Sequence, residues 1–324
     1  MNKLKVEYLG FGIGLAILIV GFFGTVFNFL PMIPNTIFAA GTTQTASSTV
    51  IVGNAAPTVT SVVLNAASSI VLTANTTTNV SINATISDNN GCGDITSINA
   101  STTVLLYRSG ITSSTCMASA TPDAANCYVA TAFTASSTCS SGTTNTTTTV
   151  AVQYFAQATD ASSTFASQNW IGTVIFRDPS NATGSTDSAG VELLTLTAIN
   201  VTTSSINYGT LSASSTSGAS NQTATSTNAG NSTTTLQLSA TATLTSGSNA
   251  IATSSQRFAT STFTFPGGAT QLTASAVTVT GFLLTSPTST SNVAKVTFWG
   301  LEVLAGTPTG TYTGVTLFTS LFQP

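Results

Sequence analysis

The sequence predicts an all-β protein in which two tandem β-sandwiches of the immunoglobulin type follow an N-terminal hydrophobic helix. Three observations support this fold class. The composition favours strands, apolar residues alternate with polar ones, and short strand-like runs are separated by Gly, Pro, Asn and Ser turns about every 8–12 residues. Beyond residue 31 no segment repeats its apolar residues every 3.6 positions, so we expect almost no helix there.

The composition also indicates where the protein works. Only 5% of the 324 residues are charged and none is histidine, whereas about a quarter of the residues of an average globular domain are charged. A surface with so few charges must be hydrated by hydroxyl and amide groups, which the many Thr, Ser and Asn residues supply. We therefore expect an extracellular β protein.

The N-terminal segment predicts export. Two lysines precede the apolar run Leu9–Leu30, and a positive flank before an apolar run directs the following chain outward. The run is long enough to cross a bilayer, but prolines and the small residues Ala39–Gly41 follow it, as in a cleavable signal. Residues 1–41 are thus a signal peptide or a membrane anchor, with cleavage favoured, and the protein contacts a membrane only through residues 9–30 if they are retained.

Next come a linker over residues 42–56 and two predicted domains, a disulfide-bonded sandwich over 57–199 and a second sandwich over 200–324. Val50–Val52 could form a short edge strand within the linker. The clearest strand is Val80–Ile86, in which apolar and polar residues alternate strictly.

Further strands follow from the same patterns. The run WIGTVIF, 170–176, is apolar on both faces and should lie in the middle of a sheet. Gly300 follows an apparent change of phase between Phe298 and Trp299, which predicts a β-bulge. Val315, Leu317 and Leu321 share one face of a closing strand. The remaining predicted strands span 59–64, 69–74, 103–108, 149–158, 190–199, 258–265, 276–284, 293–304 and 310–322.

Two stretches carry a resemblance to known modules. The motifs Tyr208–Leu211 and Thr227–Asn231 resemble the "FG-x-L" strand and "T-N-x-G-N" hairpin of Ig-like domains. The stretch Ala56–Ile95 is similar to the Ig-like or PKD-like modules of exported proteins from small-genome bacteria and archaea. The resemblance implies a surface-layer or adhesin-like protein without catalytic residues.

The four cysteines, Cys92, Cys116, Cys127 and Cys139, fall in one window and match no C-x-x-C metal motif. In an exported chain they predict two disulfides, although the sequence leaves all three pairings open. The window and the threonine run that follows it as far as Thr148 are rich in Ser, Thr and Ala, so we expect loops there, which the disulfides would order.

The stretch SDNNGCGD, Ser87–Asp94, is the candidate metal site. Asp88, Asn90 and Asp94 offer the hard oxygen ligands that calcium prefers, and Asp160 or Asp178 could add another from a neighbouring loop. The favoured alternative is a plain turn, in which Asp88 and Asn90 bond to the local backbone and Cys92 anchors a disulfide. No glutamate completes an EF-hand.

Other chemistry is poorly supported. Without histidine the chain lacks the usual proton shuttle, and its glutamates beyond the N-terminal segment, Glu192 and Glu302, lie in strand patterns that predict solvated side chains. No basic patch is present to bind nucleic acid. N-linked glycan sites of the form N-x-S/T are frequent: Asn75, Asn79, Asn83, Asn99, Asn145, Asn181, Asn200, Asn221 and Asn231.

These observations predict a non-enzymatic cell-surface protein that associates with copies of itself into an envelope coat such as a surface layer. Low charge would permit close lateral packing. The alternatives are a filament subunit that retains Leu9–Leu30 as a packing helix, and an adhesin or glycan-binding module with an envelope glycan as partner.

Overall fold

The computed structural model describes residues 46–324 except 98–99, 119–122, 131–133, 136–137 and 292. The predicted N-terminal helix and its cleavage site lie outside these residues. The chain divides between Gly53 and Asn54 into two units, of which the second, Asn54–Pro324, is compact. Within the first unit, Val50, Ile51 and Val52 are 80–90% exposed and form no strand, which favours the linker interpretation. None of the helices that the structure describes is both long and apolar enough to cross a bilayer.

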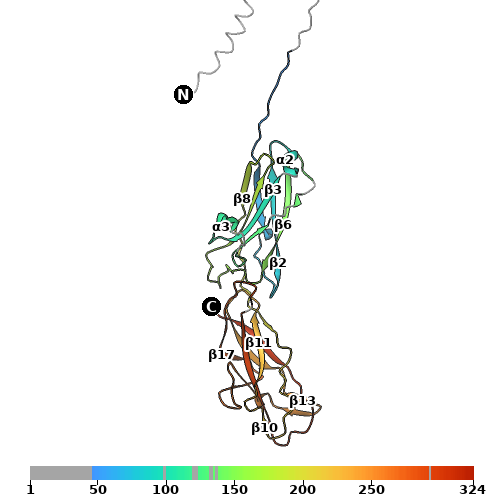
Figure 1. Cartoon of the computed structure of the whole chain (residues 1–324), viewed down its shortest axis with the longest axis vertical. Helices are drawn as coiled ribbons and strands as arrows, with labels where there is room; N and C mark the ends of the chain where they lie inside the picture. Colours follow the sequence, from blue (N-terminus) through green and yellow to red (C-terminus); the bar gives the residue numbers. More distant parts are fainter. Residues whose placement is uncertain (1–45, 98–99, 119–122, 131–133, 136–137, 292) are drawn as a thin grey trace, which may run out of the picture. The chain divides into compact units, whose positions relative to one another are not determined.

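The unit Asn54–Pro324 is all-β and contains several antiparallel sheets (Figure 1). In its first half the strand orders are β1-β2-β6-β5 and β4-β3-β7-β8. The helices described there are short. The elements are β1 (Thr58–Leu64), η2 (Asn65–Ala67), β2 (Thr77–Ser87), α2 (Cys92–Thr96), β3 (Ser101–Arg108), α3 (Ser113–Ala118), β4 (Cys127–Ala130), β5 (Thr134–Ala135), β6 (Thr143–Gln153), β7 (Trp170–Arg177) and β8 (Thr183–Asp187).

The second half has the sheet orders β16-β15-β18-β11-β9 and β17-β12-β19, and a separate β13-β14 pair. Strand β10 also pairs with β18. The elements are β9 (Ile199–Val201), β10 (Ser215–Thr216), β11 (Gln222–Asn228), β12 (Thr234–Ala240), β13 (Leu244–Ser246), β14 (Asn249–Ile251), η3 (Thr253–Ser255), β15 (Gln256–Ala259), β16 (Thr270–Gln271), β17 (Val277–Leu284), β18 (Ala294–Val303) and β19 (Thr316–Phe322).

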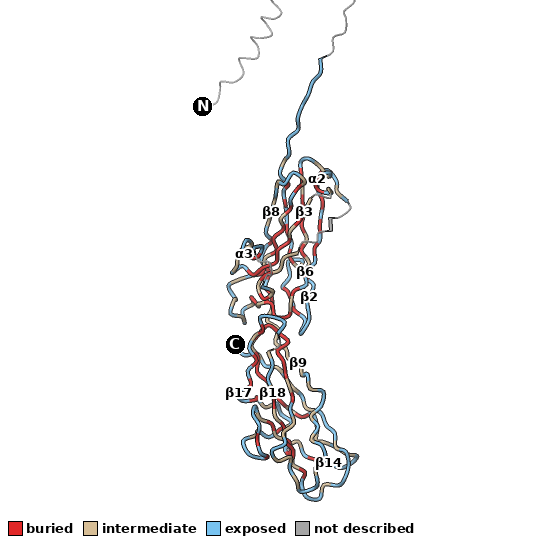
Figure 2. Tube along the Cα trace, in the orientation of Figure 1, coloured by how far each residue is buried: buried red, intermediate tan, exposed pale blue. Residues whose placement is uncertain are grey.

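The first core is built from the predicted alternation. Val80, Ile82, Ala84 and Ile86 are all at most 4% exposed, while the residues between them face outward. Trp170 fills the same core with no exposed surface, and its indole Nε1–H donates to the Gln157 carbonyl at 2.9 Å. In Figure 2 buried stretches of the tube, drawn in red, run along the strands of this half. The predicted central position of WIGTVIF is confirmed, because β7 pairs with β3 on one side and β8 on the other.

The second core surrounds Trp299, which is also fully buried. Its ring lies 5.5 Å from that of Phe258 and 5.9 Å from that of Phe318, between centroids. The indole Nε1–H donates to the Thr297 hydroxyl at 2.9 Å, which satisfies the polar atom that this large side chain buries. Each half therefore has one tryptophan at its centre.

Some predicted strands of the first half are wrong in extent. Over 69–74 and 190–199 the structure has isolated bridges, a parallel one between Ile70 and Leu193 and an antiparallel one between Val191 and Trp170, and no strand apart from β9 at the end. Ile70, Leu72, Val191 and Leu193 are buried there, but their backbone forms single bridges instead of a continuous ladder. By contrast β6 begins at Thr143, within the threonine run predicted to be loop, and pairs with β2 over its whole length. Threonines occupy both faces of this part of β6, so the sequence shows no alternation of apolar and polar residues although burial alternates.

The predicted strand 258–265 was also wrong in extent, and the predicted bulge was wrong. Strand β15 ends at Ala259. Phe263 and Phe265 lie in the loop that follows, and both side chains are buried. Strand β18 pairs on both sides of Trp299 without a register shift. A Cβ at Gly300 would lie 3.0 Å from the Phe263 ring, so this loop covers the outer face. Because the loop shields this face from water, β18 carries apolar residues on both faces around Gly300.

The Thr227–Asn231 motif forms an arch instead of the hairpin that the resemblance implies, since β11 and β12 belong to different sheets. Asn228 closes it: its side-chain oxygen accepts from Gly230 N–H, and its amide donates to the Ser232 and Thr285 carbonyls. The other motif, Tyr208–Leu211, is not a strand in the structure.

Hydroxyl and amide groups pair across the outer face of β2 and β6. Asn83 Oδ1 accepts from the Thr147 hydroxyl, and Asn145 Oδ1 accepts from the Thr85 hydroxyl, both at 2.7 Å. Cross-strand pairs of this kind stabilise a sheet by about 0.2–1 kcal/mol each. Neutral side chains thus do here what ion pairs do on most protein surfaces.

Asn231 joins the two halves. Its amide donates to the carbonyls of Ala156 and Leu194 at 2.9 and 3.2 Å, and its side-chain oxygen accepts from Leu196 N–H at 2.6 Å. The residue is 6% exposed. The amide NH₂ and the side-chain oxygen of Asn231 are therefore all bonded to backbone groups of the first half.

This burial predicts which glycan sites can be used. In a host that N-glycosylates the folded chain, Asn231 should stay unmodified, because both its amide protons are bonded and no space is left for a sugar. The sites at Asn145 and Asn200 are exposed and serve as internal controls. Peptide mass spectrometry measures the occupancy of each site, and a glycopeptide that carries sugar on Asn231 would contradict this packing.

Candidate metal centre

The SDNNGCGD stretch lies where β2 ends and α2 begins, as Figure 1 shows for these elements. Asp88 directly follows β2, and its Oδ1 accepts from Asn90 N–H at 2.8 Å, an Asx-turn. Gly91 then has φ +97°, a conformation that other residues rarely adopt. The predicted turn is confirmed in this respect.

Three carboxylates converge at this turn. One oxygen each of Asp88, Asp94 and Asp178 lie within 4.8 Å of one another. Asp94 belongs to α2, and Asp178 directly follows β7, so the group joins residues far apart in the sequence. Asp88 and Asp178 are only 4% and 1% exposed. Buried carboxylates are rare unless they are paired or bind a metal.

The hydrogen bonds account for only part of this cluster. Asp178 Oδ1 accepts from Ala182 N–H, and its Oδ2 accepts from the Asn54 side chain, both at 2.8 Å. Asp88 Oδ2 is buried and has no hydrogen-bond partner. Among the described residues, none of the three carboxylates forms a salt bridge; Arg108 and Arg257, for example, bond elsewhere.

The electrostatic consequence is considerable. Two unit negative charges 4.8 Å apart repel each other by about 3.5 kcal/mol at an effective dielectric constant of about 20. Three such charges, two of them shielded from water, would oppose folding unless a cation lies among them. The arrangement is thus suited to holding a cation through oxygen atoms.

The chain's entry into the first sheets contacts the same site. Asn54 donates to Asp178, and Ala55 N–H donates to Asn90 Oδ1 at 2.6 Å. A Cβ at Gly184 would lie 2.2 Å from the Pro57 carbonyl, so the entry packs closely on β8 as well. Sequence reasoning missed Asn54 because it lies in a low-complexity segment.

The predicted ligands are therefore only partly those that converge. Asp88 and Asp94 belong to the cluster, while the Asn90 side chain bonds to the entry segment. Of the two added candidates, Asp178 joins the cluster. Asp160 instead accepts from the backbone N–H and the hydroxyl of Thr195, each at 2.6 Å, so it fixes a loop.

The disulfides are Cys92–Cys139 and Cys116–Cys127. The first joins α2 beside the carboxylate cluster to the residues before β6, as expected for a link between this turn and the cysteine-rich window. It also fixes one side of the loop that carries Asp94.

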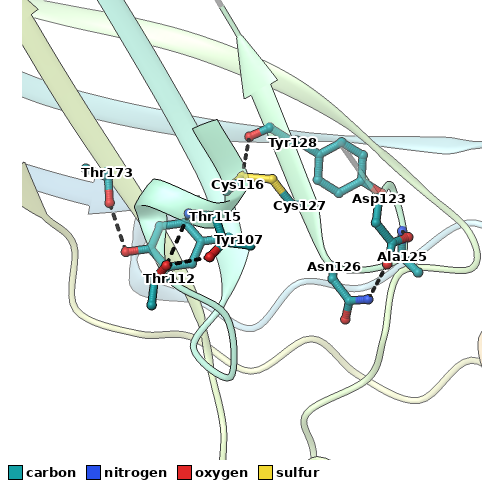
Figure 3. The surroundings of a disulfide bond; sticks show 10 residues. All are labelled: Tyr107, Thr112, Thr115, Cys116, Asp123, Ala125, Asn126, Cys127, Tyr128 and Thr173. Atoms are coloured by element: carbon teal, nitrogen blue, oxygen red, sulfur yellow. Dashed lines mark hydrogen bonds between the residues drawn. A yellow bond between two sulfur atoms is a disulfide. The ribbon is translucent and has the colours of Figure 1, made fainter. Parts of the chain in front are cut away.

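The second disulfide joins α3 to β4 in a small buried cluster (Figure 3). Beside it, the Tyr128 hydroxyl donates to the Ala124 carbonyl and accepts from Gln153 N–H. Burial raises the pKa of this phenol above its usual value, so the hydroxyl stays protonated and keeps donating. Asp123 caps the same turn by accepting from Ala125 N–H and from the Asn126 amide.

The two glutamates do not assemble with the cluster. Glu192 is exposed in the first half, as its strand pattern predicts, and Glu302 is half-buried on β18 of the second half. Among the described residues, neither glutamate belongs to a group of three or more side chains that could hold a metal ion.

Comparisons with known proteins add little. No family model and no curated protein matches the chain. A solved structure described as the secreted serine protease VesC from Vibrio cholerae aligns over 79% of this chain and 49% of its own length, with 11% identity and a TM-score of 0.19. The chain thus spans about half of that protein, and so low a score carries no argument about fold or activity.

Proposed function

We propose that the chain is a non-enzymatic cell-surface protein that associates with copies of itself into an envelope coat. The all-β fold and its two disulfides are compatible with an extracellular site of action. The observation that supports self-association is an apolar, unpaired edge in the second half.

This edge is β19, which lies at the end of its sheet and, among the strands that the structure describes, pairs only with β12. The face that Val315, Leu317 and Leu321 share lies outward and is 43–60% exposed, while Phe318 on the opposite face packs on the core. Leu283 of β17 continues the patch, because Leu283 and Leu321 both pair with Thr235.

An edge strand with exposed leucines is unusual in a monomeric protein. Soluble proteins generally place charges, prolines or bulges on edge strands to prevent pairing with other chains. Strand β19 has none of these between Thr316 and Phe322. A second copy of the chain could cover the leucines and pair with the free strand edge, which is why we assign this surface to self-association.

The experiment is a pair of lysine substitutions on the full chain. Leu317→Lys with Leu321→Lys should abolish assembly, measured by sedimentation velocity and by electron microscopy of cell envelopes, because charges would then face the neighbouring copy. The free energy of unfolding should change by no more than about 1 kcal/mol, since both side chains already keep nearly half of their surface in solvent.

Val71→Lys is the matched control, because Val71 is an exposed apolar residue (65%) of the first half that belongs neither to β19 nor to its sheet. It should assemble as the wild type does. A wild-type chain that remains monomeric at all concentrations would contradict the proposal, as would unchanged assembly of the double variant. Long fibres in place of sheets would favour the filament alternative.

A further inference from the structure

We propose that Asp88, Asp94 and Asp178 bind a calcium ion, and that the bound ion holds the entry of the chain, Asn54 and Ala55, against the first sheets. This inference does not depend on self-association, so either proposal can fail alone.

Asp88 buries one carboxylate oxygen that no described group satisfies. A carboxylate with 4% exposure and an oxygen without any hydrogen-bond partner is costly to bury, and such groups call for an explanation. This oxygen belongs to the one residue of the cluster that directly follows β2, so it cannot move into solvent without disrupting the strand end. A cation among the three carboxylates would satisfy it.

The ligand atoms select the ion. The chain has no histidine, and Cys92 and Cys139 beside the cluster form a disulfide, so the nitrogen and sulfur ligands that zinc and copper prefer are absent. Only oxygen is offered. Calcium takes six to eight oxygens at about 2.3–2.6 Å, so opposite ligands lie up to about 5 Å apart, compatible with the observed separations within 4.8 Å.

Magnesium fits this site less well. It generally binds one or two carboxylates and keeps several waters in a strict octahedron, whereas calcium accepts irregular sets of carboxylates from loops. Here three carboxylates come from two loops and a short helix. Water can supply the remaining ligands, since Asp94 is only partly buried and Asn54 is exposed.

The site also explains how the ion would act on the entry segment. Asn54 donates to Asp178, and Ala55 N–H donates to Asn90 in the same loop as Asp88. Fixing Asp178 and the Asp88–Asn90 turn through one ion would therefore fix both partners of the entry segment.

The first experiment is thermal unfolding of the full chain after treatment with EDTA. Extracellular calcium sites typically have a Kd of about 0.1–1 mM, so 10 mM calcium should raise the midpoint by about 3–10 °C relative to EDTA. Magnesium at 10 mM and NaCl at matched ionic strength should give a much smaller shift. An equal shift with magnesium would overturn the assignment to calcium, and no shift with calcium would overturn the site.

Asp88→Asn and Asp178→Asn are the test variants, and Glu192→Gln is the control that removes an exposed charge from the same half. Both test variants should lose the calcium-dependent shift, while the control keeps it. In EDTA the midpoint of Asp88→Asn should equal or exceed that of the wild type, because the change removes repulsion. A variant that unfolds early in EDTA but keeps its calcium shift would indicate a merely structural carboxylate.

Hydrogen exchange tests the effect on the entry segment. Calcium should slow exchange in a peptide that covers Ala55 by about tenfold or more in the wild type and in Glu192→Gln, and not in Asp178→Asn. Calcium binding without this protection would overturn the coupling.

Discussion

Replacing Trp170 with alanine is expected to lower the free energy of unfolding of the first half by about 3–5 kcal/mol. The side chain has no exposed surface, so its loss leaves a cavity between the sheets. It also removes the donor to the Gln157 carbonyl. Tyr128, whose ring lies 6.0 Å away, would lose its neighbour as well.

Urea unfolding followed by circular dichroism measures this loss. Trp170→Phe is the matched control, because it keeps most of the volume and should cost clearly less. In Trp170→Ala the fluorescence of Trp299 reports on the second half alone, since each core contains one tryptophan. A loss below about 1 kcal/mol would show that the first core does not depend on this side chain.

Removing the Cys92–Cys139 disulfide with two alanine substitutions should cost about 4 kcal/mol. The bond spans 47 residues, and chain-entropy estimates for a closed loop of this length give about that value. Neither cysteine is fully buried, so packing should contribute little. Unfolding is best followed by Trp170 fluorescence in a Trp299→Phe background.

Single substitutions provide the control. Cys92→Ala and Cys139→Ala each break the same bond, so each should cost nearly as much as the double variant, which is far from additive. Additive costs of the two single changes would show that the stability comes from each side chain separately and not from the bond.

Only part of the carboxylate cluster could be predicted from the sequence. Asp88 and Asp94 could be predicted because they lie only six positions apart in one short stretch. The choice between Asp160 and Asp178 could not, because it depends on which strand ends lie beside β2 after the sheets pack. Asn54 carried no signal, since asparagine in a linker is ordinary.

The strands show a similar division. Val80–Ile86 was predictable because its two faces differ in chemistry, and a strand with one buried face has that pattern. The segment Thr143–Thr149 has the same chemistry on both faces, so only its pairing with β2 reveals the strand. Phe263 covers Gly300 from a loop, and no local pattern records a contact of that kind.

The paired hydroxyl and amide groups on β2 and β6 have a consequence for the environments that this surface tolerates. Asn83 with Thr147 and Asn145 with Thr85 attract each other without net charge. Dissolved ions screen charged pairs but leave neutral pairs almost unaffected, and no proton is gained or lost on them between acid and alkaline conditions. The hydrogen bonds on this face should therefore persist from low to high salt concentration.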